Sequence, residues 1–371
     1  MRIAGERATK QMALFQQPSD IMKILVGMSG GVDSSVAALV LKEQGHEVIG
    51  VSMRLFSCNR VGSRSCCTER DRADARAVCE QLGIPYHIVD MTERFTTQVV
   101  EPFLDAYLRG ETPSPCIACN EYLKFDALYA TATSLGAGAV ATGHYARIMR
   151  NAAGRMMLMR GVDQAKDQSY FVFPALRRDL SRLMFPLGGF TKSEVRARAK
   201  EEQLPVHDKD ESQEICFVPD DDYVAYIEEM RAAQLPGKGN FVDRAGTVLG
   251  THRGIHAYTI GQRRGLGRGF GARRYVVCID AARNEVVLGD DDELLARKMT
   301  VREVVWAQDH AVPMRAQVQV RSTARAAAAV LEMKDDCVRV VFDEPQRAIA
   351  PGQAAVFYEG EEVIGGGWIT T

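Results

Sequence analysis

The stretch KILVGMSGGVDSSVAALVLKEQG, residues 23–45, decides the fold class of this chain. It opens with a short apolar run that ends at Gly27, as a buried strand does before a loop. Apolar residues then recur at helical spacing as far as Gly45, a residue suited to the position just after a helix. The glycine- and serine-rich segment 27–35 therefore joins a strand to a helix, which is the first unit of a parallel sheet.

Alternating strands and helices continue beyond this unit. Short apolar segments at 47–51 and 84–90 predict further strands, and the amphipathic segment 70–83 between them predicts a helix. Two more helices are expected over 94–108 and 125–136. This alternation predicts an α/β fold with a doubly wound parallel sheet.

The pattern changes in the second half of the chain. The alternation fades after about residue 215, and from about residue 275 apolar residues recur with period two between Gly, Asp and Asn turns. Such a run predicts a small antiparallel β-barrel or sandwich at the C-terminal end.

The composition is that of an ordinary globular protein, with 371 residues, 46% apolar, 25% charged and a formal net charge of −2. This balance excludes a globally basic nucleic-acid binder but not a local basic patch. No run approaches the about 18 apolar residues of a membrane span. Residues 1–20 lack the apolar core of a signal peptide. We therefore expect a cytoplasmic protein with no membrane partner and a flexible leader over 1–20.

Nine cysteines, an odd number in a chain without an export signal, favour reduced thiols over a disulfide framework. The apolar patterns around Cys79, Cys278 and Cys337 predict that these three side chains lie in the core.

The segment 27–35 has the features of a phosphate-binding loop. Ser29, Gly30 and Gly31 are small enough for the backbone to fold closely around an anion, and the following helix start offers free N–H groups. No lysine follows the glycines, so this is not the usual P-loop. A glycine-rich turn that merely opens a helix is the alternative, and the S-G-G-x-D-S spacing argues against it.

This S-G-G-x-D-S segment resembles the PP-loop of the ATP pyrophosphatases, which adenylate a substrate and release pyrophosphate. The resemblance implies that the backbone with Ser29, Ser34 and Ser35 holds the pyrophosphate, and that Asp33 binds Mg²⁺ or fixes the loop. Met53 would line the adenine pocket and Gly143 would let the backbone approach the nucleotide. The expected ATP site is therefore Gly27, Met28, Ser29, Gly30, Gly31, Val32, Asp33, Ser34, Met53 and Gly143.

Further segments, in order along 21–371, resemble the bacterial tRNA-specific 2-thiouridylases, one branch of the PP-loop enzymes. They are TPSPCIACNEYLKFD, ATGHYARI, KDQSYFVF, ESQEICFVP, YTIGQRRGLG and APGQAAVFYEGEEVIGGG. The resemblance implies three domains after the leader: a PP-loop domain at 21–215, a central tRNA-contacting domain at 216–285 and a C-terminal β-barrel at 286–371.

The reaction implied by this resemblance is ATP-dependent 2-thiolation of the wobble uridine in the tRNAs for Lys, Glu and Gln. Adenylation makes the C2 oxygen part of AMP, a good leaving group, and a sulfur nucleophile then attacks C2. Cys216 matches the cysteine that carries the sulfur as a persulfide. Cys119 matches the nucleophile that attacks this persulfide and leaves a transient Cys119–Cys216 disulfide. A cysteine desulfurase or a sulfur-relay protein would be the persulfide donor.

Contacts with tRNA are implied in the same way. Residues 114–116 match the loop that meets the target base, which must be flipped out to enter a pocket. The positions expected at tRNA are Ser114, Pro115, Cys116, His144, Lys166, Asp167, Gln168, Arg321, Ser322 and Gln353. The stretch 261–274, rich in arginine and glycine, predicts a phosphate-contacting surface, with a solvated loop as the alternative.

Many members of this family carry aspartate, an acid/base group near the base, where this chain has Cys116. A thiol is a weaker acid than a carboxyl group and a softer ligand, so the role of Cys116 stays open. One alternative mechanism uses a 4Fe–4S cluster on Cys116, Cys119 and Cys216, whose open iron would present a sulfide. Zinc would need a fourth ligand.

Two alternatives concern other parts of the sequence and another class of function. A metal site in the segment 57–67 is disfavoured, because two of its cysteines are adjacent and awkward as ligands of one ion: Cys58, Cys66 and Cys67. An alternative of another class is a nucleotide-binding thiol redox or metal sensor built on CIACN, residues 116–120. It would bind ATP or a metal without releasing pyrophosphate.

Overall fold

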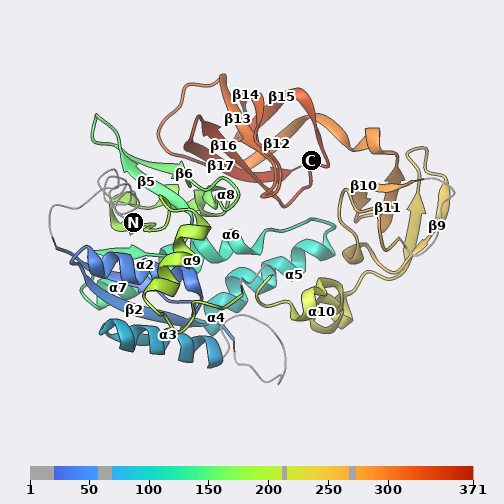
Figure 1. Ribbon diagram of the computed structural model, residues 1–371. Coiled ribbons are helices and arrows are strands. Elements are labelled where there is room, and N and C mark those ends of the chain that lie inside the picture. Colours follow the sequence, from blue (N-terminus) through green and yellow to red (C-terminus); the bar gives the residue numbers. More distant parts are fainter. Residues whose placement is uncertain (1–20, 57–68, 211–214, 267–272, 371) are drawn as a thin grey trace. The chain divides into compact units, whose positions relative to one another are not determined.

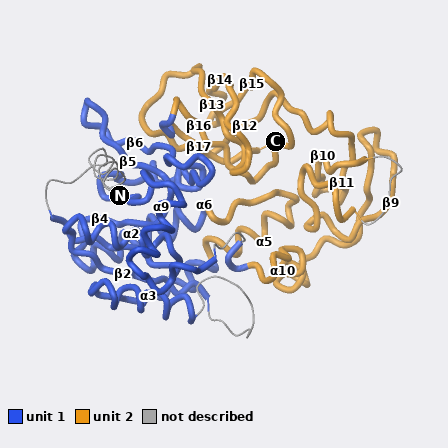
Figure 2. Tube along the Cα trace, in the orientation of Figure 1, with its two compact units in different colours: residues 1–96, 117–217, 361–363 blue, residues 97–116, 218–360, 364–371 orange. Residues whose placement is uncertain are grey.

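The chain forms two compact units (Figure 2). The computed structural model describes residues 21–56, 69–210, 215–266 and 273–370. Unit 1 consists of 1–96, 117–217 and 361–363, and unit 2 consists of 97–116, 218–360 and 364–371.

Several predictions fall outside the described residues: the leader 1–20, the three cysteines Cys58, Cys66 and Cys67, and residues 267–272 of the arginine-rich stretch. The domain boundaries near 215 and 285 stay predictions.

Unit 1 is built on a five-stranded sheet in which every neighbouring pair is parallel. The strand order is β3-β2-β1-β4-β7, with bounds β1 (Lys23–Gly27), β2 (Glu47–Arg54), β3 (Tyr86–Asp90), β4 (Ala139–Ala141) and β7 (Leu183–Met184). The order reverses between β1 and β4, so the sheet is doubly wound as predicted. Ligands of such sheets bind beyond the carboxyl ends of the strands at this switch point, where β1 leads into the glycine-rich loop.

The helices of unit 1 include α2 (Val32–Glu43), α3 (Glu69–Leu82), α4 (Thr92–Phe95), α7 (Leu128–Ser134), α8 (Ser169–Val172) and α9 (Lys192–Glu201) (Figure 1). Of these, α2, α3 and α7 pack against the sheet, and α9 packs against α2. Ile24 and Val26 of β1 enter one apolar core with Val36 of α2 and Val195 of α9. Leu25, on the opposite face of the strand, is also fully buried. The continuous apolar run of β1 is therefore that of a strand covered on both faces.

The segment 94–108, expected as one helix, contains a π-helical turn at Thr96–Val100 between α4 and α5 (Glu101–Leu108). Pro102 has no N–H to donate to the preceding turn, so the helix widens before it. The segment 125–136 begins in a similar way, because the π-helical turn Asn120–Ala127 leads into α7.

Smaller elements complete unit 1. A hairpin of β5 (Ala146–Arg150) and β6 (Met156–Arg160) follows β4, and Glu362 pairs with Met159 of this hairpin. Two 3₁₀ turns lie at Phe173–Arg177 and Leu180–Arg182.

Unit 2 contains a four-stranded sheet in the order β10-β11-β8-β9. Its strands are β8 (Gly239–Val242), β9 (Val248–His252), β10 (Tyr275–Asp280) and β11 (Glu285–Gly289). The period-two segment that begins at Tyr275 therefore belongs to this sheet and not to the C-terminal barrel. The helices of unit 2 are α5 and α10 (Tyr223–Met230), with 3₁₀ turns at Pro219–Asp221, Ala232–Gln234, Ile255–Ala257 and Asp291–Leu294.

The C-terminal strands of unit 2 form a six-stranded antiparallel barrel, which confirms the fold class predicted for this end of the chain. They are β12 (Leu295–Trp306), β13 (Met314–Gln319), β14 (Ala327–Lys334), β15 (Cys337–Arg347), β16 (Ala354–Glu359) and β17 (Glu362–Thr370). Pairing of β12 with β17 closes the barrel. A Cβ at Gly365 would lie 2.8 Å from the Val305 carbonyl oxygen, and one at Gly367 would lie 2.5 Å from that of Arg302. The glycine run near the C-terminus thus permits the closure.

Candidate functional site

The glycine-rich loop lies between β1, which ends at Gly27, and α2, which begins at Val32. Gly30 has a φ of +75°, and a Cβ there would overlap the backbone carbonyl group of Asp71 in α3. Only glycine meets both conditions, because other residues avoid positive φ and carry a Cβ. The start of α3 thus closes over one side of the loop.

Hydroxyl groups hold the loop from within. The Ser29 and Ser34 hydroxyls are 3.1 Å apart, and the Ser34 hydroxyl lies 3.2 Å from the Gly31 carbonyl oxygen. The Ser35 hydroxyl donates to the same oxygen at 2.8 Å and is fully buried. Of the three serines expected at pyrophosphate, Ser35 therefore serves the loop itself.

Asp33, in the first turn of α2, is half-buried and is the centre of a charge cluster. Lys192 Nζ lies 2.8 Å from both of its carboxylate oxygens, and the Tyr145 hydroxyl donates to Oδ1 at 2.8 Å. Lys192 is 9% exposed and begins α9, whose start is fixed by a capping box between Thr191 and Glu194. Of the two roles expected for Asp33, this geometry favours fixing the loop, since a cation at Asp33 would compete with Lys192 for the same oxygens.

The segment ATGHY brings the chain after β4 against the start of α2. A Cβ at Gly143 would lie 2.8 Å from the Ser34 backbone nitrogen, so this glycine allows the two backbones to touch. Met53, the other residue expected around adenine, is half-buried in β2.

His144 is buried and hydrogen-bonded. Its Nδ1 is 2.7 Å from the Thr142 hydroxyl and its Nε2 is 3.4 Å from Lys124 Nζ. Burial, and secondly the charge of Lys124, hold its pKa well below 6.5. Phe185 packs edge-on against the ring at 5.7 Å. The imidazole is thus neutral, and its predicted contact with tRNA stays a prediction.

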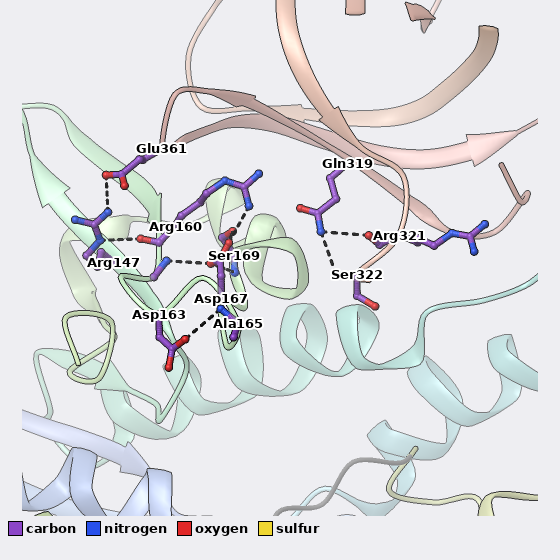
Figure 3. Close-up of polar contacts among 11 residues, drawn as sticks. Arg147, Arg160, Asp163, Ala165, Asp167, Ser169, Gln319, Arg321, Ser322 and Glu361 are labelled. Carbon is purple, nitrogen blue, oxygen red and sulfur yellow. Dashed lines mark hydrogen bonds and ion pairs between the residues drawn. The ribbon is translucent and has the colours of Figure 1, made fainter. Parts of the chain in front are cut away.

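The KDQ segment is held by internal hydrogen bonds (Figure 3). Asp167 accepts from Arg160 Nη1 at 2.9 Å, from the Gly161 amide at 2.9 Å and from Ser169. Gln168 Oε1 accepts from the Tyr145 amide at 3.0 Å. The side chains of Asp167 and Gln168 therefore stabilise the turn that contains Lys166.

In unit 2, Arg321 and Ser322 lie in a loop after β13. Gln319 Nε2 donates to the carbonyl oxygens of both residues, at 3.2 and 3.1 Å (Figure 3). Arg321 also donates to the Ala348 carbonyl oxygen. The loop is ordered by these bonds, and contact with tRNA stays a prediction.

Gln353, another residue expected at tRNA, bonds to the backbone just before the expected base-contacting residues 114–116. Its Nε2 donates to the Thr112 carbonyl oxygen at 2.9 Å and to that of Pro113 at 3.4 Å. The Thr112 amide in turn donates to the Pro351 carbonyl oxygen at 2.8 Å. Gln353 therefore fastens the chain just before Ser114 within unit 2.

The three cysteines of the expected sulfur site are all described. Cys119 ends α6 (Pro115–Cys119) and is 9% exposed, Cys216 is half-buried, and Cys116 is exposed. Cys119 and Cys216 belong to unit 1, whereas Cys116 belongs to unit 2. Among the residues that the structure describes, no group of three or more His, Cys, Asp or Glu side chains is arranged to hold a metal ion. The cluster alternative therefore gains no support from the structure.

The remaining described cysteines differ from one another. Cys79 is fully buried as predicted, and burial raises the pKa of its thiol to about 12. Cys337 is half-buried. The prediction that Cys278 lies in the core is wrong, because its strand β10 leaves this side chain exposed. Period two places a residue on a face of a sheet without saying whether that face is covered.

Three residues around the loop were missed from the sequence: Tyr145, Lys192 and Lys209. Lys209 Nζ donates to the Gly30 carbonyl oxygen at 2.9 Å across 179 residues of sequence. Lys192 and Asp33 are 159 residues apart. The only local signal was the T-x-x-E capping box of Thr191 and Glu194, which contains Lys192. It indicates the start of a helix and not a charge cluster.

No helix among the described residues has the length and apolar character needed to cross a membrane.

Family models match three consecutive stretches: the tRNA methyl transferase HUP domain at 22–220, the tRNA methyl transferase PRC-barrel domain at 225–290 and the aminomethyltransferase beta-barrel domain at 296–369. The tRNA-specific 2-thiouridylase MnmA of Geobacter metallireducens is 48% identical over 356 residues, with 94% of this chain and 96% of the relative covered. The protein of that name from Carboxydothermus hydrogenoformans is 48% identical over 355 residues, covering 94% and 97%. A solved 4-thiouridine synthetase–RNA complex with bound ATP is 18% identical, with a TM-score of 0.36, and covers 57% of this chain and 51% of that one.

Proposed function

The chain belongs to the family of tRNA-specific 2-thiouridylases, and on that premise we propose that it exchanges the C2 oxygen of the wobble uridine for sulfur in the tRNAs for Lys, Glu and Gln. The observation that carries the proposal is that one compact unit holds both a loop suited to phosphates and the cysteines 119 and 216. The first serves adenylation and the second serves sulfur transfer.

Adenylation is the task proposed for the loop after β1. The uridine C2 oxygen attacks the α-phosphorus of ATP, the bond to the β-phosphate oxygen breaks, and pyrophosphate leaves. The backbone N–H groups at the start of α2 and the hydroxyls of Ser29 and Ser34 are the donors available for the pyrophosphate charge. Mg²⁺ bound by the phosphates would neutralise part of this charge. Asp33 would act on the loop through its ion pair with Lys192.

Sulfur transfer is the task proposed for the two cysteines. The terminal sulfur of a Cys216 persulfide forms a bond to C2, the C2–O bond breaks, and AMP leaves. The Cys119 thiolate then attacks Cys216 Sγ, which releases the thiocarbonyl on the tRNA and leaves a Cys119–Cys216 disulfide. A thiol reductant must restore both thiols, and a cysteine desulfurase or relay protein must reload Cys216.

The test separates the two steps. We expect Cys216→Ser to release pyrophosphate in the presence of tRNA while adding no sulfur, because adenylation needs no thiol. Cys119→Ser should form no free thiolated tRNA, because nothing then attacks Cys216 Sγ and the tRNA stays joined to Cys216 through the transferred sulfur. Cys337→Ser, a half-buried cysteine in the barrel, is the matched control and should thiolate at the wild-type rate. Normal thiolation by Cys216→Ser would contradict the proposed sulfur route.

The cluster mechanism and the sensor are distinguished by two further measurements. Iron and acid-labile sulfide in anaerobically purified protein, with activity lost on their removal, would favour the cluster on Cys116, Cys119 and Cys216. ATP binding without pyrophosphate release, with and without tRNA, would favour the sensor. Transfer of a methyl group, the activity named for two of the matching families, is tested at the same time, since a methyl group adds a different mass to the uridine than exchange of oxygen for sulfur.

A further inference from the structure

The loop between β1 and α2 contains no lysine of its own, so a lysine that meets a phosphate there must come from elsewhere in the chain. Two lysines that reach the loop region are already paired with carboxylates. Lys192 Nζ lies 2.8 Å from both oxygens of Asp33. Lys209 Nζ lies 2.6 Å from Asp71 Oδ1 and 2.6 Å from Asp74 Oδ2. Because their positive charges are balanced within the protein, these two lysines add little attraction for the anion of a ligand.

Lys124 is a third lysine of this region and differs from the other two. It is half-buried in the π-helical turn Asn120–Ala127, and its Nζ lies 3.4 Å from His144 Nε2. The imidazole is neutral, so it accepts a hydrogen bond without balancing the charge of the ammonium group. In the part of the chain that the structure describes, no carboxylate forms an ion pair with Lys124. A half-buried ammonium group without a counter-charge favours a bound anion.

The acidic side chains nearest to Lys124 in sequence are held by arginines. Glu121 Oε1 lies 3.3 Å from Arg177 Nε, and Asp126 forms an ion pair with Arg178. The arginines thus balance the two carboxylates of this turn, and the charge of Lys124 stays unbalanced.

Lys124 lies at the edge of the sheet where the loop begins. It comes four residues before Leu128, the first residue of α7, and a Cβ at Gly27 would lie 3.1 Å from Leu128 Cδ1. Gly143 is next in sequence to the imidazole that Lys124 contacts, and a Cβ there would lie 2.8 Å from the Ser34 backbone nitrogen at the start of α2. All of these residues belong to unit 1. Lys124 is therefore close to the switch point between β1 and β4, where parallel sheets bind their ligands.

We propose that Lys124 binds a phosphate oxygen of ATP and supplies the positive charge that the loop itself lacks. An ammonium group has three N–H donors, so one of them stays on His144 Nε2 while another donates to the phosphate. Lys124 follows Cys119 by five residues, in the helical segment that continues from α6. The inference rests on the proposed function and adds to it a residue that binds the nucleotide from the segment of the proposed nucleophile.

Calorimetry with ATP and with adenosine tests the phosphate contact. In Lys124→Met, the affinity for ATP should fall about 10- to 100-fold, the loss expected for one charge-assisted hydrogen bond. The affinity for adenosine, which has no phosphate, should stay within about twofold of wild type, and this measurement also shows that the variant is folded. Lys200→Met, at an exposed lysine of α9, is the matched control and should bind both ligands as wild type does.

A second variant separates the charge of Lys124 from its support of His144. Lys124→Gln keeps a side-chain N–H for His144 Nε2 but carries no charge, so its affinity for ATP should fall as far as that of Lys124→Met. Wild-type affinity for ATP in Lys124→Gln would show that the lysine only positions the imidazole, and would overturn the inference. An equal loss of affinity for adenosine and for ATP would also count against it, because the lost contact would then not be with a phosphate.

Transfer RNA is the other source of phosphate groups near His144, a residue expected at tRNA. Filter binding of tRNA in the absence of ATP should give the same affinity for wild type, Lys124→Met and Lys124→Gln. Variants that bind ATP normally but bind tRNA more weakly would assign this lysine to the RNA backbone, against the inference. A wild type that binds no ATP would instead contradict the proposed function itself.

Discussion

At the residue scale, the site depends on charges that meet from distant parts of the sequence. Asp33 was predicted because it lies inside the S-G-G-x-D-S motif, whose chemistry can be read from six consecutive residues. Lys192 and Lys209 could not be predicted, since nothing near either lysine indicates a partner 159 or 179 residues away. The parallel fold decides these contacts, because it returns later segments to the carboxyl edge of β1.

The ion pair between Asp33 and Lys192 should be strongly coupled. We expect Asp33→Asn and Lys192→Met each to lower the free energy of unfolding, because each leaves a charge without its partner at a mostly buried position. The double variant should lose less than the sum of the two, with a coupling energy of about 1–3 kcal/mol. Urea denaturation of the four proteins measures this term, and additive losses would contradict the assigned pair.

His144 should make the stability depend on pH. Its pKa is lower in the folded chain than the 6.5 of the unfolded chain, so below that pH the unfolded state binds more protons. Stability is therefore lost as the pH falls from about 6.5 toward the folded pKa, by up to about 1.4 kcal/mol per pH unit. Wild type should lose more stability than His144→Gln between about pH 7.5 and pH 5.5. Equal losses would mean that His144 titrates normally.

At the element scale, the strand, loop and helix of 23–45 were predictable because each has its own period and a glycine at each junction. The π-helical turn between α4 and α5 was not predictable, since an apolar period of 3.6 does not reveal one widened turn before a proline. The contact between the loop and α3 could not be predicted either, although it is one of the two reasons that only glycine fits at position 30.

Gly30→Ala and Gly45→Ala form a matched pair that tests this contact. Both positions have positive φ, so both variants should lose about 1–2 kcal/mol for backbone strain. A Cβ at Gly45 meets nothing within 4 Å, whereas one at Gly30 overlaps the Asp71 carbonyl group. Only Gly30→Ala should also lose ATP binding, measured by calorimetry. Equal ATP affinity in the two variants would show that the packing of α3 against the loop does not matter for the nucleotide.

At the scale of the whole molecule, the sequence predicted a parallel sheet and a terminal antiparallel barrel, and both are present. Which segments share a compact unit could not be read from periodicity. Residues 97–116 belong to unit 2 although they lie between two parts of unit 1. Gln353 shows the physical reason, because its side chain ties Thr112 to the loop before β16.

Hydrogen exchange tests this tie. Gln353→Leu should raise the exchange rate of the amides around Thr112 by roughly fivefold, the effect of losing one neutral hydrogen bond. Exchange within β14 should stay as in wild type. Gln317→Leu, an exposed glutamine on β13, is the control and should change neither region. Unchanged exchange near Thr112 in Gln353→Leu would assign this glutamine another role.

Thiolation of tRNA is tested most directly by the mass of the wobble uridine after incubation of tRNA with the protein, ATP and a protein-bound persulfide donor. A thiolating enzyme should give a gain equal to the exchange of one oxygen for one sulfur at that uridine alone. One AMP and one pyrophosphate should be released for each sulfur added, and there should be no gain when ATP or the donor is withheld. A uridine that keeps its mass with a competent donor present, or gains the mass of a methyl group, would contradict the proposed thiolation.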